Sequence, residues 1–124
     1  MSKQTASLWF WRFFALAGLG LLFWGGFREN PIPQYSHDFD KIIHVTGFTI
    51  VTVACLMAFT LNVWVIIPVL LMLLGLSIEI GQGWFLPMRS FDWEDFRMDV
   101  IGILLGVALI MPFRYWSIQP KASS

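Results

Sequence analysis

The sequence predicts an all-α membrane protein, a polytopic bundle of four transmembrane helices. Of its 124 residues, 57% are hydrophobic and only 13% are charged. A soluble domain usually carries about twice that share of charged residues, and one of this size cannot bury so much apolar surface. This composition excludes a soluble enzyme and a disordered chain. A formal net charge of +0 offers no basic surface to nucleic acid.

Four apolar segments are long enough, or nearly so, to cross a membrane, which takes about 20 helical residues. We place the helices at about 8–27, 42–61, 63–80 and 95–116, the last around an apolar run at about 98–113. They leave no stretch for a soluble domain, so we expect residues 1–124 to form a single membrane domain. The first segment lacks a small-residue cleavage site before Arg28, which favours a retained helix over a signal peptide cleaved near Gly25. The second and third segments meet around Asn62, which predicts a tight antiparallel hairpin.

The charged residues are distributed unevenly between the two sides of the membrane. With four spans, both termini lie on one side, and the loops after the first and third helices lie on the other. The Lys and Arg residues divide evenly between the sides, but all 8 Asp and Glu residues lie on the loop side. The orientation rule counts basic residues near the spans, and acids contribute little to it. We expect the termini, which carry basic residues and no acids, to lie in the cytoplasm.

The first polar group lies where the second helix is expected to begin. Asp40 and His44 are four residues apart and share a helix face, with Lys41 beside them. Asp40 is a candidate N-cap, because a carboxylate accepts hydrogen bonds from the first free N–H groups of a helix. His44 would then lie one turn inside the membrane, where a structural hydrogen bond between helices is the alternative to a functional role.

The second polar group, Glu79 and Gln82, lies at the end of the third helix and shares one face. An unpaired glutamate in the hydrocarbon zone costs about 2–3 kcal/mol or more. Glu79 should therefore be neutral, paired or facing water. It is either a functional group or one half of a structural ion pair.

The third polar group opens the fourth helix. Asp92, Asp95 and Asp99 are spaced as one acidic stripe, and Asp92, or Ser90 before it, is the expected N-cap. Arg89 lies just upstream and is the expected internal partner of these carboxylates.

Two glycines continue this acidic stripe into the membrane. Gly102 and Gly106 are four residues apart, and such a small-residue pair lets another helix approach closely. The facing helix could belong to this chain or to a second copy, so an oligomer is left open.

Because the three groups lie on one side of the membrane, we expect them to converge on one end of the bundle. We expect His44, Glu79, Arg89 and Asp95 in one pocket, within direct or one-water contact. These residue types suit acid–base chemistry, a divalent metal or a phosphate, and a purely structural polar network is the alternative. The candidate acid–base groups are His44, Glu79, Asp95 and Asp99, the candidate metal ligands are His44, Glu79 and Asp95, and the candidate ligand-binding residues are Lys41, Gln82, Arg89 and Ser90.

The ordered combination of these motifs resembles the VanZ-like family of small bacterial membrane proteins. The resemblance lies in Asp40-Lys41-x-x-His44, in Glu79-x-x-Gln82 and in the segment 87–106, and it covers roughly residues 38–110. The family pattern often has Asn where this chain has Asp99. Family members are associated with low-level resistance to the glycopeptide teicoplanin. The resemblance therefore implies a multi-pass protein of the bacterial inner (cytoplasmic) membrane with a role in the cell envelope, and it brings no catalytic mechanism.

Two functions are the leading hypotheses. In the first, the protein binds or modifies a lipid or lipid-linked headgroup at the outer interface, where Arg89 and Lys41 grip a phosphate or carboxylate. In the second, it is an intramembrane acid–base or metal-assisted hydrolase or transferase that acts on a lipid-linked phosphate. A proton or ion pathway is disfavoured because the polar groups cluster at one end of the bundle.

The expected partners are membrane lipids or lipid-linked precursors. We expect little room in so small a bundle for an enclosed cavity of several hundred Å³, the usual volume of a small-molecule site. An amphiphile avoids this limit, because its tail stays in the bilayer and only its headgroup enters the protein. A divalent metal is left open as a cofactor.

Overall fold

The computed structural model describes residues 2–28, 38–59 and 63–118. These segments form four helices, namely α1 (Lys3–Gly26), α2 (Phe39–Ala58), α3 (Ile66–Phe85) and α4 (Trp93–Ile118). All four are long and apolar enough to cross a membrane, α4 over Trp93–Phe113, and the described residues contain no strand. The prediction of an all-α, four-helix membrane protein is confirmed. The hairpin predicted at Asn62 lies outside the described residues.

The start of α2 differs from the prediction. α2 begins at Phe39, so Asp38 occupies the N-cap position and the prediction of Asp40 as the cap is wrong. Asp40 lies in the first turn instead, where the free N–H groups and the helix dipole stabilise a carboxylate.

The starts of α3 and α4 follow from their first residues. α3 begins three residues later than predicted, which places Pro68 in its first turn, where the missing N–H breaks no helical hydrogen bond. α4 begins directly after Asp92, whose Oδ1 accepts the backbone N–H of Glu94 at 2.9 Å. This contact satisfies one of the orphan donors that every helix start leaves.

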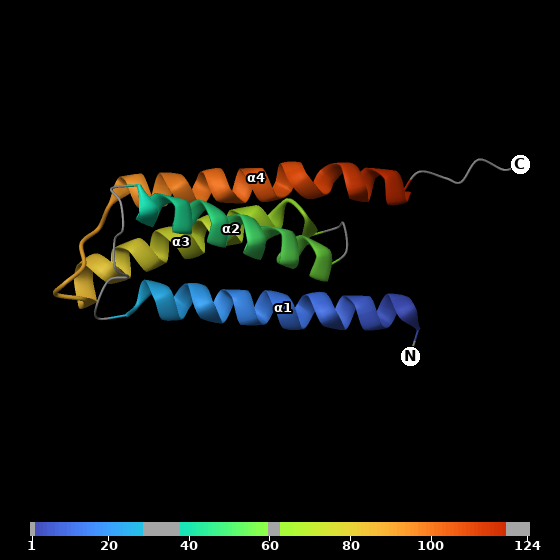
Figure 1. The fold of residues 1–124 in the computed structure, drawn as a ribbon, viewed down its shortest axis with the longest axis horizontal. Helices are drawn as coiled ribbons and strands as arrows, with labels where there is room; N and C mark the ends of the chain where they lie inside the picture. Colours follow the sequence, from blue (N-terminus) through green and yellow to red (C-terminus); the bar gives the residue numbers. More distant parts are fainter. Residues whose placement is uncertain (1, 29–37, 60–62, 119–124) are drawn as a thin grey trace, which may run out of the picture.

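The helices form a bundle in which α2 lies between α1 and α4 (Figure 1). α2 packs most extensively along α4 and then along α1, and α3 packs mainly against α4. The start of α1 and the end of α4 lie at one end of the bundle, and the end of α1 and the starts of α2 and α4 lie at the other. α1 buries only Ala15 and exposes most of its large apolar side chains, as a helix with one side against lipid does.

Two glycines of α4 allow its close approach to α2. A Cβ atom on Gly102 would lie 2.6 Å from the carbonyl oxygen of Val45, and one on Gly106 would lie 2.7 Å from Cβ of Thr52. Both glycines therefore face α2 of the same chain. The Thr49 hydroxyl donates to the carbonyl oxygen of Gly102 at 3.1 Å, which adds a polar contact across this helix pair.

Candidate functional site

A cleft of about 550 Å³ opens at the end of the bundle where α2 and α4 begin. The cleft is open along its side, so it is not the enclosed cavity of several hundred Å³ for which we expected little room. Gly25 contributes to this room, because it lines the cleft and an added Cβ there would meet nothing within 4 Å.

The cleft has an apolar part and a polar end. Between α1 and α2 its walls are apolar, with Leu21, Leu22, Ile50 and Val51 among them. The titratable side chains that line it gather at the start of α2, the start of α4 and the segment between α3 and α4, and they are Asp40, His44, Arg89, Asp92, Asp95 and Asp99.

His44 is held by a hydrogen bond across the α2–α4 interface. Its Nδ1 lies 2.6 Å from Oδ1 of Asp99, which is 1% exposed. An ionised carboxylate only accepts hydrogen bonds, so Nδ1 donates to it and the ring orientation is fixed. When the ring is neutral, its lone pair lies on the other ring nitrogen, Nε2.

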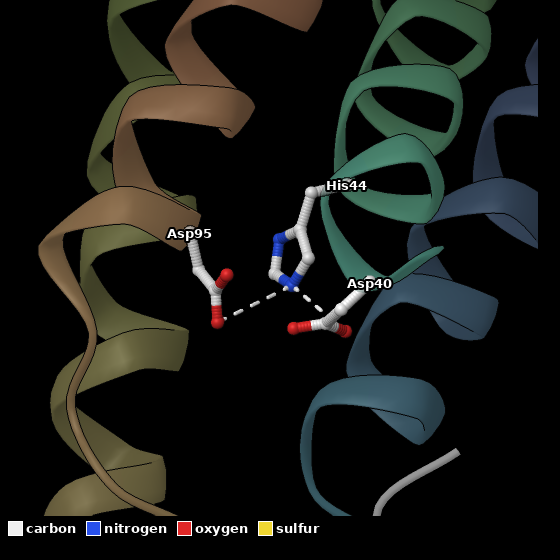
Figure 2. Close-up of side chains that lie close together, drawn as sticks. All are labelled: Asp40, His44 and Asp95. Carbon is white, nitrogen blue, oxygen red and sulfur yellow. Dashed lines mark ion pairs between the residues drawn. The ribbon is translucent and has the colours of Figure 1, made fainter. Parts of the chain in front are cut away.

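Nε2 of His44 faces two further carboxylates. It lies 3.8 Å from Oδ1 of Asp40, one turn earlier on α2, and 3.8 Å from Oδ2 of Asp95 on α4 (Figure 2). In Figure 2 the imidazole points between these two carboxylates, which come from different helices. The three side chains bring a possible ligand atom each to within 4.8 Å of one another, a geometry that could hold a metal ion.

Glu79 lies close to the same imidazole. Its side chain is 0% exposed, and neither carboxylate oxygen has a hydrogen-bond partner among the described residues. One oxygen lies within 4.8 Å of a ring nitrogen of His44 and of a carboxylate oxygen of Asp99. Glu79 therefore faces the interior of the bundle and not lipid, in a cluster rich in negative charge.

A glycine makes room for this buried cluster. A Cβ atom on Gly75 of α3 would lie 2.9 Å from Oδ2 of Asp99 and 3.4 Å from its Cβ. The position of Asp99 thus depends on the absence of a side chain one helix away. The role of Gly75 could not be predicted from the sequence, because nothing near it in the chain indicates which residue α3 will face.

Two of the predicted ligand-binding residues contact the end of α1. Nε2 of Gln82 donates to the carbonyl oxygen of Gly26 at 2.9 Å, and Nη1 of Arg89 lies 3.4 Å from that of Gly25 and 3.5 Å from that of Arg28. These carbonyls belong to the last turn of a helix and its exit, where they lack helical partners. Ser90 lines the cleft beside Arg89.

The predicted ion pairs of Arg89 with the acidic stripe do not form. Within the described part of the chain, no carboxylate oxygen lies within ion-pair distance of Arg89, because its guanidinium is directed to the C-terminal end of α1. Lys41 also lies apart from the cleft. Its Nζ lies 3.9 Å from Oδ1 of Asp38 and 4.0 Å from Oε2 of Glu94, so Lys41 and Arg89 do not converge on one ligand.

The structure therefore brings His44, Asp95, Asp99, Gln82, Arg89 and Ser90 to one cleft, with Glu79 buried behind it. Asp40 belongs with them, although from the sequence it was expected on the same helix face as His44 and as an N-cap, and not as a candidate site residue. The signal was present, since Asp40 and His44 are one helical turn apart. An imidazole flanked by carboxylates can transfer protons or bind a metal ion, and the adjacent guanidinium can bind an anion.

Comparison with known protein families gives a match over most of the chain. A model of the family described as VanZ/LLP1 matches residues 3–115. No curated protein matches the chain, and no solved structure does. The matched segment includes all four candidate membrane spans and every residue of the cleft. The chain belongs to the VanZ/LLP1 family.

Proposed function

We propose that this VanZ-family membrane protein binds the anionic headgroup of a membrane lipid or lipid-linked precursor. The proposal places the cleft at the outer interface of a bacterial inner membrane, with both chain termini in the cytoplasm. The observation that carries it is the division of the cleft into an apolar part along α1 and α2 and a polar end. An amphiphile has the same division, so its tail and its headgroup each meet a matching surface.

Arg89 is the proposed anchor of the headgroup. It lines the polar end of the cleft, and its contacts to Gly25 and Arg28 are 3.4 and 3.5 Å long, beyond the usual length of a strong hydrogen bond. Its guanidinium therefore keeps donors for a ligand. The planar guanidinium matches the oxygens of a phosphate or carboxylate bidentately, whereas a lysine supplies a single point charge.

Equilibrium binding of a fluorescent polyprenyl phosphate to the purified protein in lipid nanodiscs tests the proposal. The wild type should bind saturably, and Arg89→Ala should bind about tenfold to a hundredfold more weakly, as expected when a charged hydrogen-bond donor is lost. Arg89→Lys should also bind weakly while it keeps a cation beside the carbonyls of α1. Arg97→Ala is the matched control, because Arg97 is exposed, pairs with Glu94 and lies outside the cleft.

Unchanged binding by the Arg89 variants would contradict the proposal. If Arg89→Ala, Arg89→Lys and Arg97→Ala all bind the polyprenyl phosphate as the wild type does, Arg89 is an ordinary interfacial charge. Thermal unfolding in the same nanodiscs shows whether weaker binding comes from the lost headgroup contact or from a destabilised α1. Arg89→Lys should unfold at the wild-type temperature.

A second candidate function is an intramembrane enzyme that acts on such a headgroup as a hydrolase or transferase. The observation that favours it is the orientation of His44, which donates to Asp99 and presents Nε2 between Asp40 and Asp95. This is the arrangement of a general acid or base with an orienting carboxylate. Release of phosphate from a lipid-linked pyrophosphate by the wild type, and its loss in His44→Gln with binding retained, would support an enzyme. An unchanged headgroup after prolonged incubation would exclude this activity.

A contribution to glycopeptide resistance is the physiological consequence that we propose for headgroup binding. Expression in a teicoplanin-susceptible bacterium should raise the inhibitory concentration of the drug, and Arg89→Ala at equal expression should not. An equal increase with the wild type and with Arg89→Ala would show that the resistance does not depend on the cleft.

A further inference from the structure

We propose that a divalent transition-metal ion binds at the polar end of the cleft, held by Nε2 of His44 and by the carboxylates of Asp40 and Asp95. Two atoms that each bond one metal ion at about 2.1 Å lie at most about 4.2 Å apart. Nε2 lies 3.8 Å from a carboxylate oxygen of each partner, and the three ligand atoms lie within 4.8 Å of one another. A small rotation of either carboxylate completes the site.

The surroundings of His44 fit a metal-binding histidine. A metal-bound imidazole almost always donates its other ring N–H to a carboxylate or carbonyl, which fixes the ring and makes the ligating nitrogen a better donor. Nδ1 of His44 donates to Asp99 in this way at 2.6 Å. Asp99 is thus the proposed positioning residue, and Gly75 keeps the space that it occupies.

The buried Glu79 is an independent observation that points to a cation. It is fully buried, both of its oxygens lack hydrogen-bond partners among the described residues, and it faces His44 and Asp99. An unpaired carboxylate in a dry interior is costly, and neighbouring carboxylates increase that cost. The two positive charges of a divalent ion bound to His44 would lower this cost for Glu79, Asp95 and Asp99 together.

The ligand types indicate the class of metal. Imidazole suits first-row transition metals such as Zn²⁺ and Fe²⁺, whereas Ca²⁺ and Mg²⁺ prefer oxygen ligands throughout. Carboxylates suit Mn²⁺ as well, and water or a substrate oxygen completes its coordination. A metal ion in the cleft would also act together with Arg89 on an anionic headgroup. Its charge would offset that of the carboxylates, which would otherwise repel the headgroup. This last role rests on the proposed function, whereas the metal site itself does not.

Titration of the purified, detergent-solubilised protein with Mn²⁺ alone tests the site, with free Mn²⁺ followed by electron paramagnetic resonance. The wild type should remove about one Mn²⁺ per chain from solution, as a single such site requires. Asp95→Asn and His44→Gln should each weaken this binding by about tenfold or more. Glu94→Gln is the matched control, because it removes one acid from the same turn of α4, outside the cleft.

Circular dichroism and gel filtration in detergent establish that each variant is folded. If Asp95→Asn does not fold, Asp40→Asn replaces it, because Asp40 lies at the more exposed rim of the cluster. Absence of saturable Mn²⁺ binding by the folded wild type overturns the proposal, and so does equal weakening by Asp95→Asn and Glu94→Gln. No amphiphile is added in this titration. A negative result would therefore overturn the metal site alone, and the proposed binding of polyprenyl phosphate would still be tested by its own assay.

Discussion

Nδ1 of His44 lies 2.6 Å from Oδ1 of Asp99, although 55 residues separate the two in the chain. This contact joins α2 to α4 at the polar end of the bundle. One and two turns further along α4, Gly102 and Gly106 bring the same two helices to backbone contact. The small residues therefore set the distance at which the imidazole and the carboxylate meet, so the packing of the membrane segment and the geometry of the cleft depend on each other.

The His44–Asp99 contact should appear as a coupling energy. A double-mutant cycle with His44→Ala, Asp99→Ala and the double variant should give an interaction of about 1–3 kcal/mol in thermal or denaturant unfolding in detergent. Asp99→Asn should lose less stability than Asp99→Ala, because its amide oxygen still accepts the N–H of His44. Additive single effects would show that the contact contributes nothing.

The effect of Gly75→Ala should depend on residue 99. In the wild type the added methyl group lies 2.9 Å from Oδ2 of Asp99, so we expect a destabilisation of about 1–3 kcal/mol from overpacking. In an Asp99→Ala background the clash is gone, and Gly75→Ala should be neutral or stabilising by up to about 1 kcal/mol, because alanine favours the helix. The unfolding temperatures of the four combinations measure this reversal. The same loss in both backgrounds would contradict it.

The glycines of the α2–α4 interface should not tolerate a large side chain. Gly102→Leu and Gly106→Leu should each cost about 3 kcal/mol or lower the yield of folded protein, because the new Cβ meets backbone and β-branched atoms that cannot move away alone. Gly20→Leu on α1 is the control, since a Cβ there meets nothing within 4 Å. If Gly102→Leu and Gly106→Leu unfold at the same temperature as Gly20→Leu, close packing of α2 and α4 at these glycines does not contribute to stability.

The predictable and the unpredictable parts of this molecule differ in physical origin. Long apolar runs predict spans because the bilayer requires about 20 residues whatever the tertiary structure is. The position of His44 one turn after Asp40 was likewise readable from helical spacing. The direction of Arg89 was not, since the nearby carboxylates of the acidic stripe and the distant carbonyls of α1 are both suitable partners. The role of Gly75 and the size of the cleft depend on which helix faces which, and local spacing does not contain that information.

The orientation of the bundle remains a prediction with a direct test. Basic residues and no acids flank the termini side, so we expect the chain end after Lys121 to lie in the cytoplasm. Green fluorescent protein fused after Lys121 should fluoresce, and alkaline phosphatase fused at the same place should be inactive. The reverse pattern would place the cleft on the cytoplasmic face and contradict the proposed outer interface.

The account's central claim, that an amphiphile occupies the cleft, is tested most directly by filling the cleft from α1. Gly25 lines it, and an added Cβ there meets nothing within 4 Å, so Gly25→Phe should fold and project its ring into the space for the headgroup. Gly20→Phe makes the same change on the same helix, at an equally open position outside the cleft. In polyprenyl phosphate binding to nanodisc-embedded protein, we predict a loss of affinity of about tenfold or more for Gly25→Phe, equivalent to about 1.4 kcal/mol, and wild-type affinity for Gly20→Phe. Equal, wild-type affinity of both variants would contradict the claim.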